Sequence, residues 1–238
     1  MSAATEVTAG AGPTRRDRVR AATMAEIKAA ALELLRSRSA TDLTFADIAR
    51  EVGMTAPGLY RYYKDRDDLL VALIYDAYSD LATCLHAAIA DITDPREALS
   101  GLARAYRGWA VADPIQFALI FGVPIPGFDV PESAGTLECA HRAMAALESV
   151  PARAAARPQG VSPLVDRVGP AIGAALQDKR VLDVELADDV RQAMMIAYAS
   201  LHGFTCLEVF GHIGYLDDLA RDELFDAQIE MCALTLGL

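Results

Sequence analysis

The sequence predicts an all-α protein, with an N-terminal three-helix domain followed by a larger helical domain. Hydrophobic residues form 53% of the 238 positions, and alanine dominates among them. The apolar–polar alternation of half-buried strands is nearly absent. Apolar residues recur instead at the spacing of helix faces, with cap residues, prolines and glycines at the ends. No apolar run reaches the ~18 residues of a membrane-spanning helix, so no membrane partner is expected.

The first predicted segment, residues 1–17, is a disordered basic arm. Its arginines include Arg16, and Arg18 follows directly. Arms of this kind in DNA-binding domains reach phosphates or the minor groove, although a solvated basic tail explains the composition nearly as well. The first helix is expected from about Val19 to Arg38. Its apolar stripe consists of Met24, Ile27, Ala31, Leu34 and Leu35.

The stretch from Leu43 to Leu70 carries the strongest local signals. Thr44 is a suitable N-cap residue, with Asp47 three residues later as a partial capping box. Gly53 comes where a left-handed residue ends a helix. Thr55 is expected to cap the next helix, with Pro57 in its first turn. The apolar face between the caps consists of Phe45, Ile48, Ala49 and Val52.

Two short helices joined by a tight turn form a helix-turn-helix, with residues 56–63 as the predicted recognition helix. Leu59 and Tyr63 are four residues apart and are expected to enter the core, which leaves residues 60–62 facing outward. A helical hairpin with exposed aromatic side chains is the alternative. We rank it lower because the caps, the turn glycine and the outward side chains all agree.

The remainder of the chain is punctuated by proline and glycine, which divide it into further helices. A loop is expected over residues 123–131, a mobile segment over 151–160 and a turn over 211–214. The predicted helices cover about residues 66–91, 95–112, 115–121, 132–150, 162–178, 189–210 and 215–236.

The net charge of −11 hides two regions of opposite sign. Residues 1–66 hold 11 Lys and Arg against 8 Asp and Glu, a balance of +3, whereas residues 67–238 hold 11 against 25, a balance of −14. We therefore expect a DNA-binding domain over residues 18–66 and an acidic body over 67–238. The basic end would be attracted to a polyanion, and the acidic body would keep non-specific affinity low.

Other classes of function leave little trace in the sequence. The four cysteines form no CxxC pair, and Cys139 with His141 is too small a group for zinc, so we expect no metal or cofactor. Reduced thiols in a cytoplasmic protein are the expected state. No nucleophile elbow, phosphate loop or close carboxylate pair is present, so an enzyme is not expected.

The run from Leu43 to Thr55, with Gly58 to Tyr63 and Arg66 to Leu70, resembles the DNA-binding domain of tetracycline-repressor (TetR) family regulators. The resemblance covers roughly residues 20–75. Further along, Tyr198 to Phe204 and Phe121 to Phe128 resemble a branch with a Trp/His/Gly-type C-terminal segment, in which Tyr198 stands where that branch often has tryptophan.

The resemblance implies DNA contacts at the positions of Thr44, Ala56, Pro57, Gly58, Tyr60, Tyr62, Lys64 and Arg66. To these we add Arg16, Arg18, Arg50, Thr55 and Arg61. Hydroxyls and cations at these positions suit phosphate contacts, and the tyrosine rings suit sugars or a thymine methyl group. Few of these side chains read base edges, so DNA shape and bridging water are expected to carry much of the specificity.

The resemblance also implies a small-molecule pocket and a homodimer formed by the last two helices. Candidate pocket residues are Tyr106, Trp109, Phe117, Phe121, His141, Met144, Met195, Tyr198 and His202. Candidate interface residues are Leu201, Phe204, Leu207, Phe210, Phe225 and Ile229. For each pocket residue alone, ordinary core packing is the better explanation, and fully enclosed helices remain an alternative to the dimer.

The function expected from these features is a DNA-binding transcriptional regulator. It would be a repressor on a palindromic operator, released when a small-molecule effector binds in the body and shifts the helix that starts near residue 66. The alternative is a helical ligand-binding or interaction protein that does not bind an operator.

Overall fold

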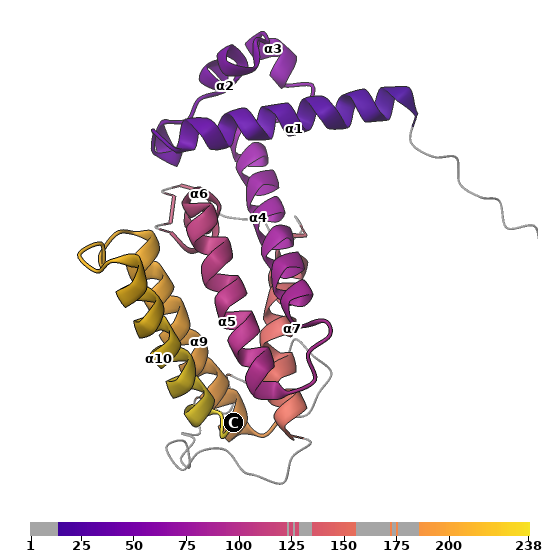
Figure 1. Cartoon of the computed structure of the whole chain (residues 1–238). Coiled ribbons are helices and arrows are strands. Elements are labelled where there is room, and N and C mark those ends of the chain that lie inside the picture. Colours follow the sequence, from indigo (N-terminus) through magenta and orange to yellow (C-terminus); the bar gives the residue numbers. More distant parts are fainter. Residues whose placement is uncertain are drawn as a thin grey trace, which may run out of the picture. The chain divides into compact units, whose positions relative to one another are not determined.

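The computed structural model describes residues 14–122, 124, 125, 127, 128, 135–155, 172, 175 and 186–238. Within these ranges the chain is helical and contains no strand, as the sequence predicts. It divides into two compact units, Met1–Leu70 and Val71–Leu238. Figure 1 labels their helices.

The N-terminal unit consists of three helices and one helical turn. They are α1 (Arg15–Leu35), the 3₁₀ turn η1 (Ala40–Asp42), α2 (Phe45–Val52) and α3 (Ala56–Leu59), followed by the first turn of α4 (Arg66–Ile89). α1 packs against α2, and α2 packs against α3. The small core contains Ile27, Ala31, Leu35, Leu43, Phe45, Ile48, Ala49, Leu59, Tyr63, Leu69 and Leu70.

α1 begins four residues earlier than the sequence predicts. Thr14 is its N-cap and forms a complete capping box with Asp17, in which the Thr14 hydroxyl accepts from the Asp17 backbone N–H at 3.2 Å. Arg16 therefore lies in the first helical turn, which corrects the prediction that the arm extends to residue 17. Residues 1–13 of that arm lie outside the described part.

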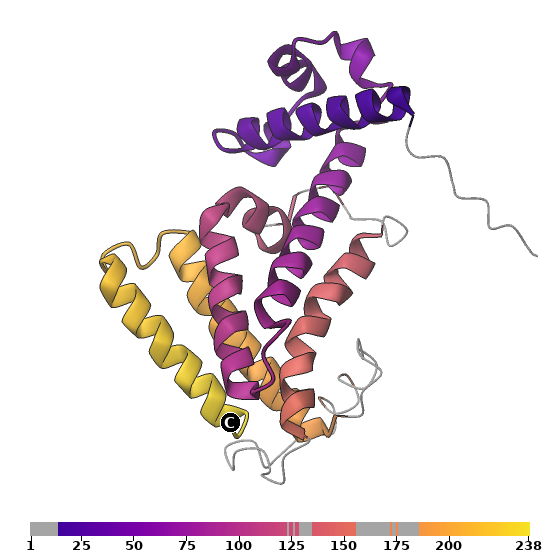
Figure 2. The same ribbon diagram turned by 45° about the vertical axis from the view of Figure 1, so that its right-hand side comes forward.

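The C-terminal unit is a bundle of antiparallel helices (Figures 1 and 2). Besides the rest of α4 it contains α5 (Pro95–Ala112), α6 (Pro114–Phe121), α7 (Thr136–Ala155), α9 (Asp188–Val209) and α10 (Asp218–Thr235). Asp94 caps α5 and Asp113 caps α6, and a proline follows each cap at the first helical position. Because these caps and prolines fix the helix ends, the predicted bounds of α5, residues 95–112, are confirmed.

Further differences from the predicted bounds lie in α7 and α10. α7 continues through Pro151 to Ala155, although the sequence predicts that the helix ends at residue 150. Arg153 donates to the backbone carbonyls of Ile92 and Ile89, and these contacts hold the last turn. α10 begins at Asp218, because Asp217 accepts the Ala220 N–H at 2.8 Å and caps it there. The helix predicted at 162–178 lies outside the described residues, apart from 172 and 175.

Candidate DNA-binding surface and ligand cavity

The turn between α2 and α3 is fixed by local contacts that the sequence predicts. The Thr44 hydroxyl accepts the Asp47 backbone N–H at 3.2 Å. Gly53 adopts φ +72°, the left-handed conformation that glycine reaches without a steric penalty. Asp47 pairs with Arg38 and Arg50, each at 3.1 Å. The hydrogen bond from Thr44 and these two guanidinium groups lower the pKa of Asp47.

α3 is shorter than predicted. Its regular part ends at Leu59, and residues 60–62 continue as turns. Thr55 occupies the N-cap position, but its side chain makes no cap hydrogen bond, which corrects the predicted cap. Leu59 is fully buried and Tyr63 is 3% exposed, so the predicted inward pair is confirmed.

Tyr60 and Tyr62, the two tyrosines predicted to face outward, each contact another side chain of the N-terminal unit. Tyr60 is 59% exposed, and its ring packs against Phe45 with centroids 5.0 Å apart. Tyr62 is half-buried under the Arg20 guanidinium, which lies 5.1 Å from the ring centroid. Arg20 also donates to the Arg61 backbone carbonyl at 3.1 Å. Arg20 of α1 therefore holds residues 61 and 62 in place, a contact that its position in an arginine-rich run does not reveal.

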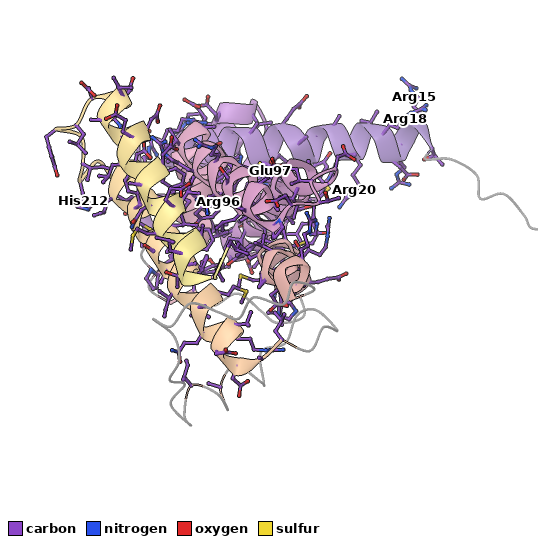
Figure 3. The ribbon with its side chains drawn as sticks, turned by 60° about the horizontal axis from the view of Figure 1, so that its bottom comes forward. Arg15, Arg18, Arg20, Arg96, Glu97 and His212 are labelled. Atoms are coloured by element: carbon purple, nitrogen blue, oxygen red, sulfur yellow. The ribbon has the colours of Figure 1, made fainter. Side chains whose placement is uncertain are left out.

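Most predicted DNA contacts lie on the surface of the N-terminal unit. Figure 3 shows Arg15 and Arg18 at the first turns of α1. Half-buried positions are Ala56, Gly58, Tyr62 and Arg66. Exposed positions are Arg16, Arg18, Thr44, Arg50, Thr55, Pro57, Tyr60, Arg61 and Lys64.

Arg66 differs from the other cations because its guanidinium is already engaged. It donates to the Thr41 backbone carbonyl at 3.3 Å and pairs with Asp67 at 2.9 Å, with 29% of its side chain exposed. These contacts tie η1 to the start of α4. Lys64 is exposed, and its backbone N–H donates to Asp68 at 2.9 Å.

The C-terminal unit encloses a cavity of about 210 Å³. Five of the nine predicted pocket residues line it, namely Tyr106, Phe121, Met144, Tyr198 and His202, and their contact with a ligand stays a prediction. The walls come from α4, α5, the end of α6, α7, α9 and Leu236 beyond α10. The remaining lining residues are Tyr78, Leu81, Leu85, Leu99, Leu102, Ala103, Ala140, Ala143, Leu147, Val150, Pro151, Met194, Ala197 and Leu201.

A polar cluster forms one corner of the cavity. The Tyr106 hydroxyl and His202 Nδ1 are 2.6 Å apart, and His202 Nε2 lies 3.4 Å from the Cys206 sulfur. The Tyr198 ring stacks on His202, with centroids 5.4 Å apart and planes at 19°. Burial lowers the pKa of His202, which keeps the imidazole neutral at pH 7, and raises the pKa of Tyr198 to about 12.

The other four predicted pocket residues do not line the cavity. Phe117 is fully buried among the rings of Tyr106, Phe121 and His202, so it packs behind the wall. Trp109 packs on Phe117, with centroids 6.4 Å apart. His141 and Met195 face outward, because they lie on the solvent sides of α7 and α9.

The predicted interface residues also separate into two groups. Leu207 and Phe210 are each 45% exposed and remain available to a partner. Leu201, Phe204, Phe225 and Ile229 are between 0% and 7% exposed within the single chain, which corrects their assignment to an interface. A side chain that folding already buries has no surface left to bury against a second copy.

Arg107 of α5 covers two of these buried side chains. Its guanidinium lies over the Phe225 ring at 4.9 Å and over the Phe204 ring at 5.8 Å. It also pairs with Glu208 at 2.6 Å and with Asp222 at 2.7 Å, which raises its pKa. The inner faces of α9 and α10 are thereby closed by α5.

The outer faces of α9 and α10 carry a further set of exposed apolar side chains. On α9, Ile196 and Leu207 are eleven residues apart and share one helix face, with the exposed small residues Ala199 and Gly203 between them. The α10 face repeats the spacing of three and four residues. It consists of Leu224, Ala227, Met231 and Leu234.

Neither a metal site nor a membrane span is found in the part of the chain that the structure describes. No group of three or more His, Cys, Asp or Glu side chains is arranged to hold a metal ion there. No helix among the described residues is both long and apolar enough to cross a bilayer.

Comparisons with known proteins agree with this architecture. Residues 20–73 match the sequence pattern of bacterial regulatory proteins of the tetR family, and residues 99–232 match the tetracyclin repressor-like C-terminal domain. The HTH-type transcriptional regulator Mb1846 of Mycobacterium bovis is 34% identical over 222 residues, which are 89% of this chain and 93% of that protein.

Solved structures show the same fold. The regulatory protein SCO4313 superposes with a TM-score of 0.75 at 33% identity, covering 92% of this chain and 98% of the other. The TetR family transcriptional regulator PfmR from Thermus thermophilus shares the fold at 15% identity, with a TM-score of 0.59 over 89% of this chain and 98% of its own. Both domain matches and the identity over most of the chain place this protein in the TetR family of helix-turn-helix transcriptional regulators.

Proposed function

We propose that this regulator is a homodimeric repressor that leaves a palindromic operator when a small molecule occupies the cavity of the C-terminal unit. The single observation that carries the proposal is that α4 joins the predicted recognition helix to the wall of the cavity. This helix begins at Arg66, directly after the recognition segment, and later supplies Tyr78, Leu81 and Leu85 to the cavity wall.

The DNA-binding half of the proposal rests on the exposed face around α3. Tyr60 offers a phenol to phosphates, and the Thr44 hydroxyl lies at the N-terminus of α2, where backbone N–H groups favour an anion. Arg50 and Lys64 supply exposed cations on the same unit. The positive balance of residues 1–66 and the negative balance of 67–238 favour approach by this unit.

The dimer rests on the outer faces of α9 and α10. Leu207, Phe210, Leu224, Met231 and Leu234 are each 45–55% exposed, and contiguous exposed apolar side chains often mark a protein–protein interface. The exposed Ala199 and Gly203 allow a second helix to approach closely. Two copies related by a two-fold axis would present two recognition segments to half-sites about 34–36 Å apart.

Release follows from the position of α4 in both halves of the chain. A ligand that moves Tyr78 or Leu85 favours one placement of α4 over another, and this couples the cavity to DNA affinity. Coupling energies of this kind are about 1–3 kcal/mol, which corresponds to roughly 5- to 150-fold in affinity. The segment from Tyr198 to Phe204, with His202 in the polar corner, supports assignment to the Trp/His/Gly-type branch of the family.

The experiment that tests the proposal is fluorescence anisotropy of the protein on labelled DNA from upstream of its own gene. We expect saturable binding of two protomers, with an affinity that falls steeply as salt rises. A double variant, Leu207→Asp with Leu224→Asp, should lose dimerisation and operator binding together. Absence of salt-dependent binding would favour the alternative, a helical ligand-binding protein without an operator.

A further inference from the structure

Among the residues that the structure describes, no charged side chain lines the cavity, and the hydrogen-bonding groups that do line it are not spread evenly. Every residue that lines it is aliphatic or aromatic, except for the phenols of Tyr78, Tyr106 and Tyr198 and the imidazole of His202. The ring contacts bring these four together, because Tyr78 and Tyr106 both pack on Phe121, and Tyr106 and Tyr198 both contact His202.

The described residues that line the opposite end of the cavity are all apolar. On each of three helices, a polar lining residue is followed along the cavity by an apolar one. The pairs are Tyr78 and Leu85 on α4, Tyr106 and Leu99 on α5, and His202 and Met194 on α9. The shift from the polar to the apolar residue goes forward in the sequence on α4 and backward on α5 and α9. α4 runs antiparallel to α5 and α9 (Figure 2), so all three shifts point the same way. Each shift spans seven or eight residues, or about 10–12 Å of helix. The cavity is therefore elongated, with one polar and one apolar end.

The volume limits the size of the occupant. A cavity of roughly 150 Å³ in a protein core holds benzene, which has six non-hydrogen atoms. By the same ratio, this cavity of about 210 Å³ accommodates roughly eight non-hydrogen atoms.

We propose that the effector of this regulator is an uncharged, elongated amphiphile of medium length, with an apolar tail and one hydroxyl or carbonyl head group. The tail lies toward Leu99 and Val150, and the head group lies among Tyr78, Tyr198 and His202. The inference rests on the proposed function, because it names the ligand class of the same cavity.

Charge selection follows because none of the described lining residues is a counter-ion for a charged ligand. A carboxylate or ammonium group loses its hydration on entry, and burial without a partner is far more costly than burial of a hydroxyl. His202 is no substitute for a cation, since burial keeps it neutral. The side chains of Tyr78 and Tyr198 line the cavity, so their hydroxyls can donate to or accept from a neutral head group.

The test uses isothermal titration of the full-length protein with four compounds that share one tail length: 1-octanol, 2-octanone, octanoate and octylammonium. We expect the alcohol and the ketone to bind, with the two ions at least tenfold weaker. Octanoate or octylammonium binding as tightly as 1-octanol would overturn the proposal, and so would the absence of binding by all four.

Variants of the lining residues test whether the ligand occupies the cavity and which end holds its head group. Tyr198→Phe keeps the ring but removes the hydroxyl, and should weaken 1-octanol about two- to tenfold, the range of one hydrogen bond. Ala143→Leu fills the cavity and should abolish binding. The matched control is Tyr215→Phe, because Tyr215 is 82% exposed and outside the cavity. Equal affinity of Tyr198→Phe and Tyr215→Phe for 1-octanol would contradict the placement of the head group.

Anisotropy on operator DNA in the same samples separates this inference from the proposed function. Selective binding of the neutral compounds without release of DNA would leave the ligand class standing and contradict ligand-released repression. Release of DNA by octanoate alone would support the repressor and overturn the ligand class.

Discussion

In the N-terminal unit the side chains proposed for function lie on the surface, whereas in the C-terminal unit they line an interior cavity. Tyr60 directly follows α3 and faces solvent, whereas its neighbour Leu59 is buried in the core. Tyr106 and His202, in contrast, are packed among the aromatic rings of the core itself. Mutations of these side chains in the N-terminal unit should therefore change function without changing stability. In the C-terminal unit, mutations of the proposed functional side chains should change both.

The largest expected effect comes from the core of the C-terminal unit. Phe225→Ala removes a fully buried ring between Phe204 and the Arg107 guanidinium, and should lower the free energy of unfolding by about 3–5 kcal/mol. Urea denaturation at several protein concentrations measures it. Leu224→Ala is the neighbouring control on the exposed side, and should weaken dimerisation more than folding.

If Leu224→Ala destabilised the isolated fold as much as Phe225→Ala, the division of α10 into an inner and an outer face would be wrong. Sedimentation equilibrium of both variants distinguishes the cases, because only the outer face should change the monomer–dimer constant at equal folded fraction.

The second effect separates folding from DNA binding on adjacent residues. Leu59→Ala should lower the unfolding free energy by about 2–5 kcal/mol, because the leucine is fully buried. Tyr60→Ala should leave the melting temperature nearly unchanged and weaken operator binding about two- to tenfold, the range of one hydrogen bond. Melting curves and anisotropy on both variants provide the comparison. A large drop in melting temperature for Tyr60→Ala would instead make it a core residue.

The difference between the units also explains what the sequence could and could not predict. Thr44, Gly53 and the two Asp-Pro pairs at 94–95 and 113–114 act within a few residues, so helix ends near them follow from local chemistry. Arg66 shows the limit even in the first unit, because its partner Thr41 lies 25 residues away.

The cavity depends on contacts that no local pattern encodes. Arg107 closes the inner faces of α9 and α10 through Glu208, 101 residues away, so sequence periodicity shows two apolar faces without telling which is buried. The aromatic character of Phe117 and Trp109 favours a place in the pocket, but both pack behind its wall. Tyr78 could have been predicted as a cavity residue from the sequence, because it lies three residues before Leu81 and seven before Leu85 and therefore shares their helix face.

The third effect concerns phosphate contacts and sharpens the difference between exposed and engaged cations. Lys64→Ala should flatten the slope of log affinity against log salt by about 1, the loss of one neutralised phosphate. Arg66→Ala, predicted from the sequence to act in the same way, should change the slope less because Asp67 already pairs with the guanidinium. Anisotropy titrations between 50 and 300 mM salt, roughly the range in which counter-ion release is measured, test both.

Equal flattening by the two variants would show that Arg66 turns to the phosphate when DNA is present. Arg66→Ala should in addition cost about 1 kcal/mol of stability, since it loses a hydrogen bond to Thr41 in a partly exposed position. Lys64→Ala should not.

The smallest effect is a pH dependence confined to the cavity. Burial lowers the pKa of His202 in the folded state, so the unfolded chain takes up a proton first as the pH falls below about 6.5. The groups that face the imidazole are Tyr106, Tyr198 and Cys206, and burial raises the pKa of each, so none carries a negative charge near neutral pH. Stability should therefore be full above pH 7 and should decline as the pH falls below about 6.5, the pKa of an unperturbed histidine. Comparison of melting curves with those of His202→Gln tests this, because the glutamine variant lacks the titrating ring and should lose that part of the decline. An identical decline in both proteins would mean that another group titrates, and that the cavity stays open to water around His202.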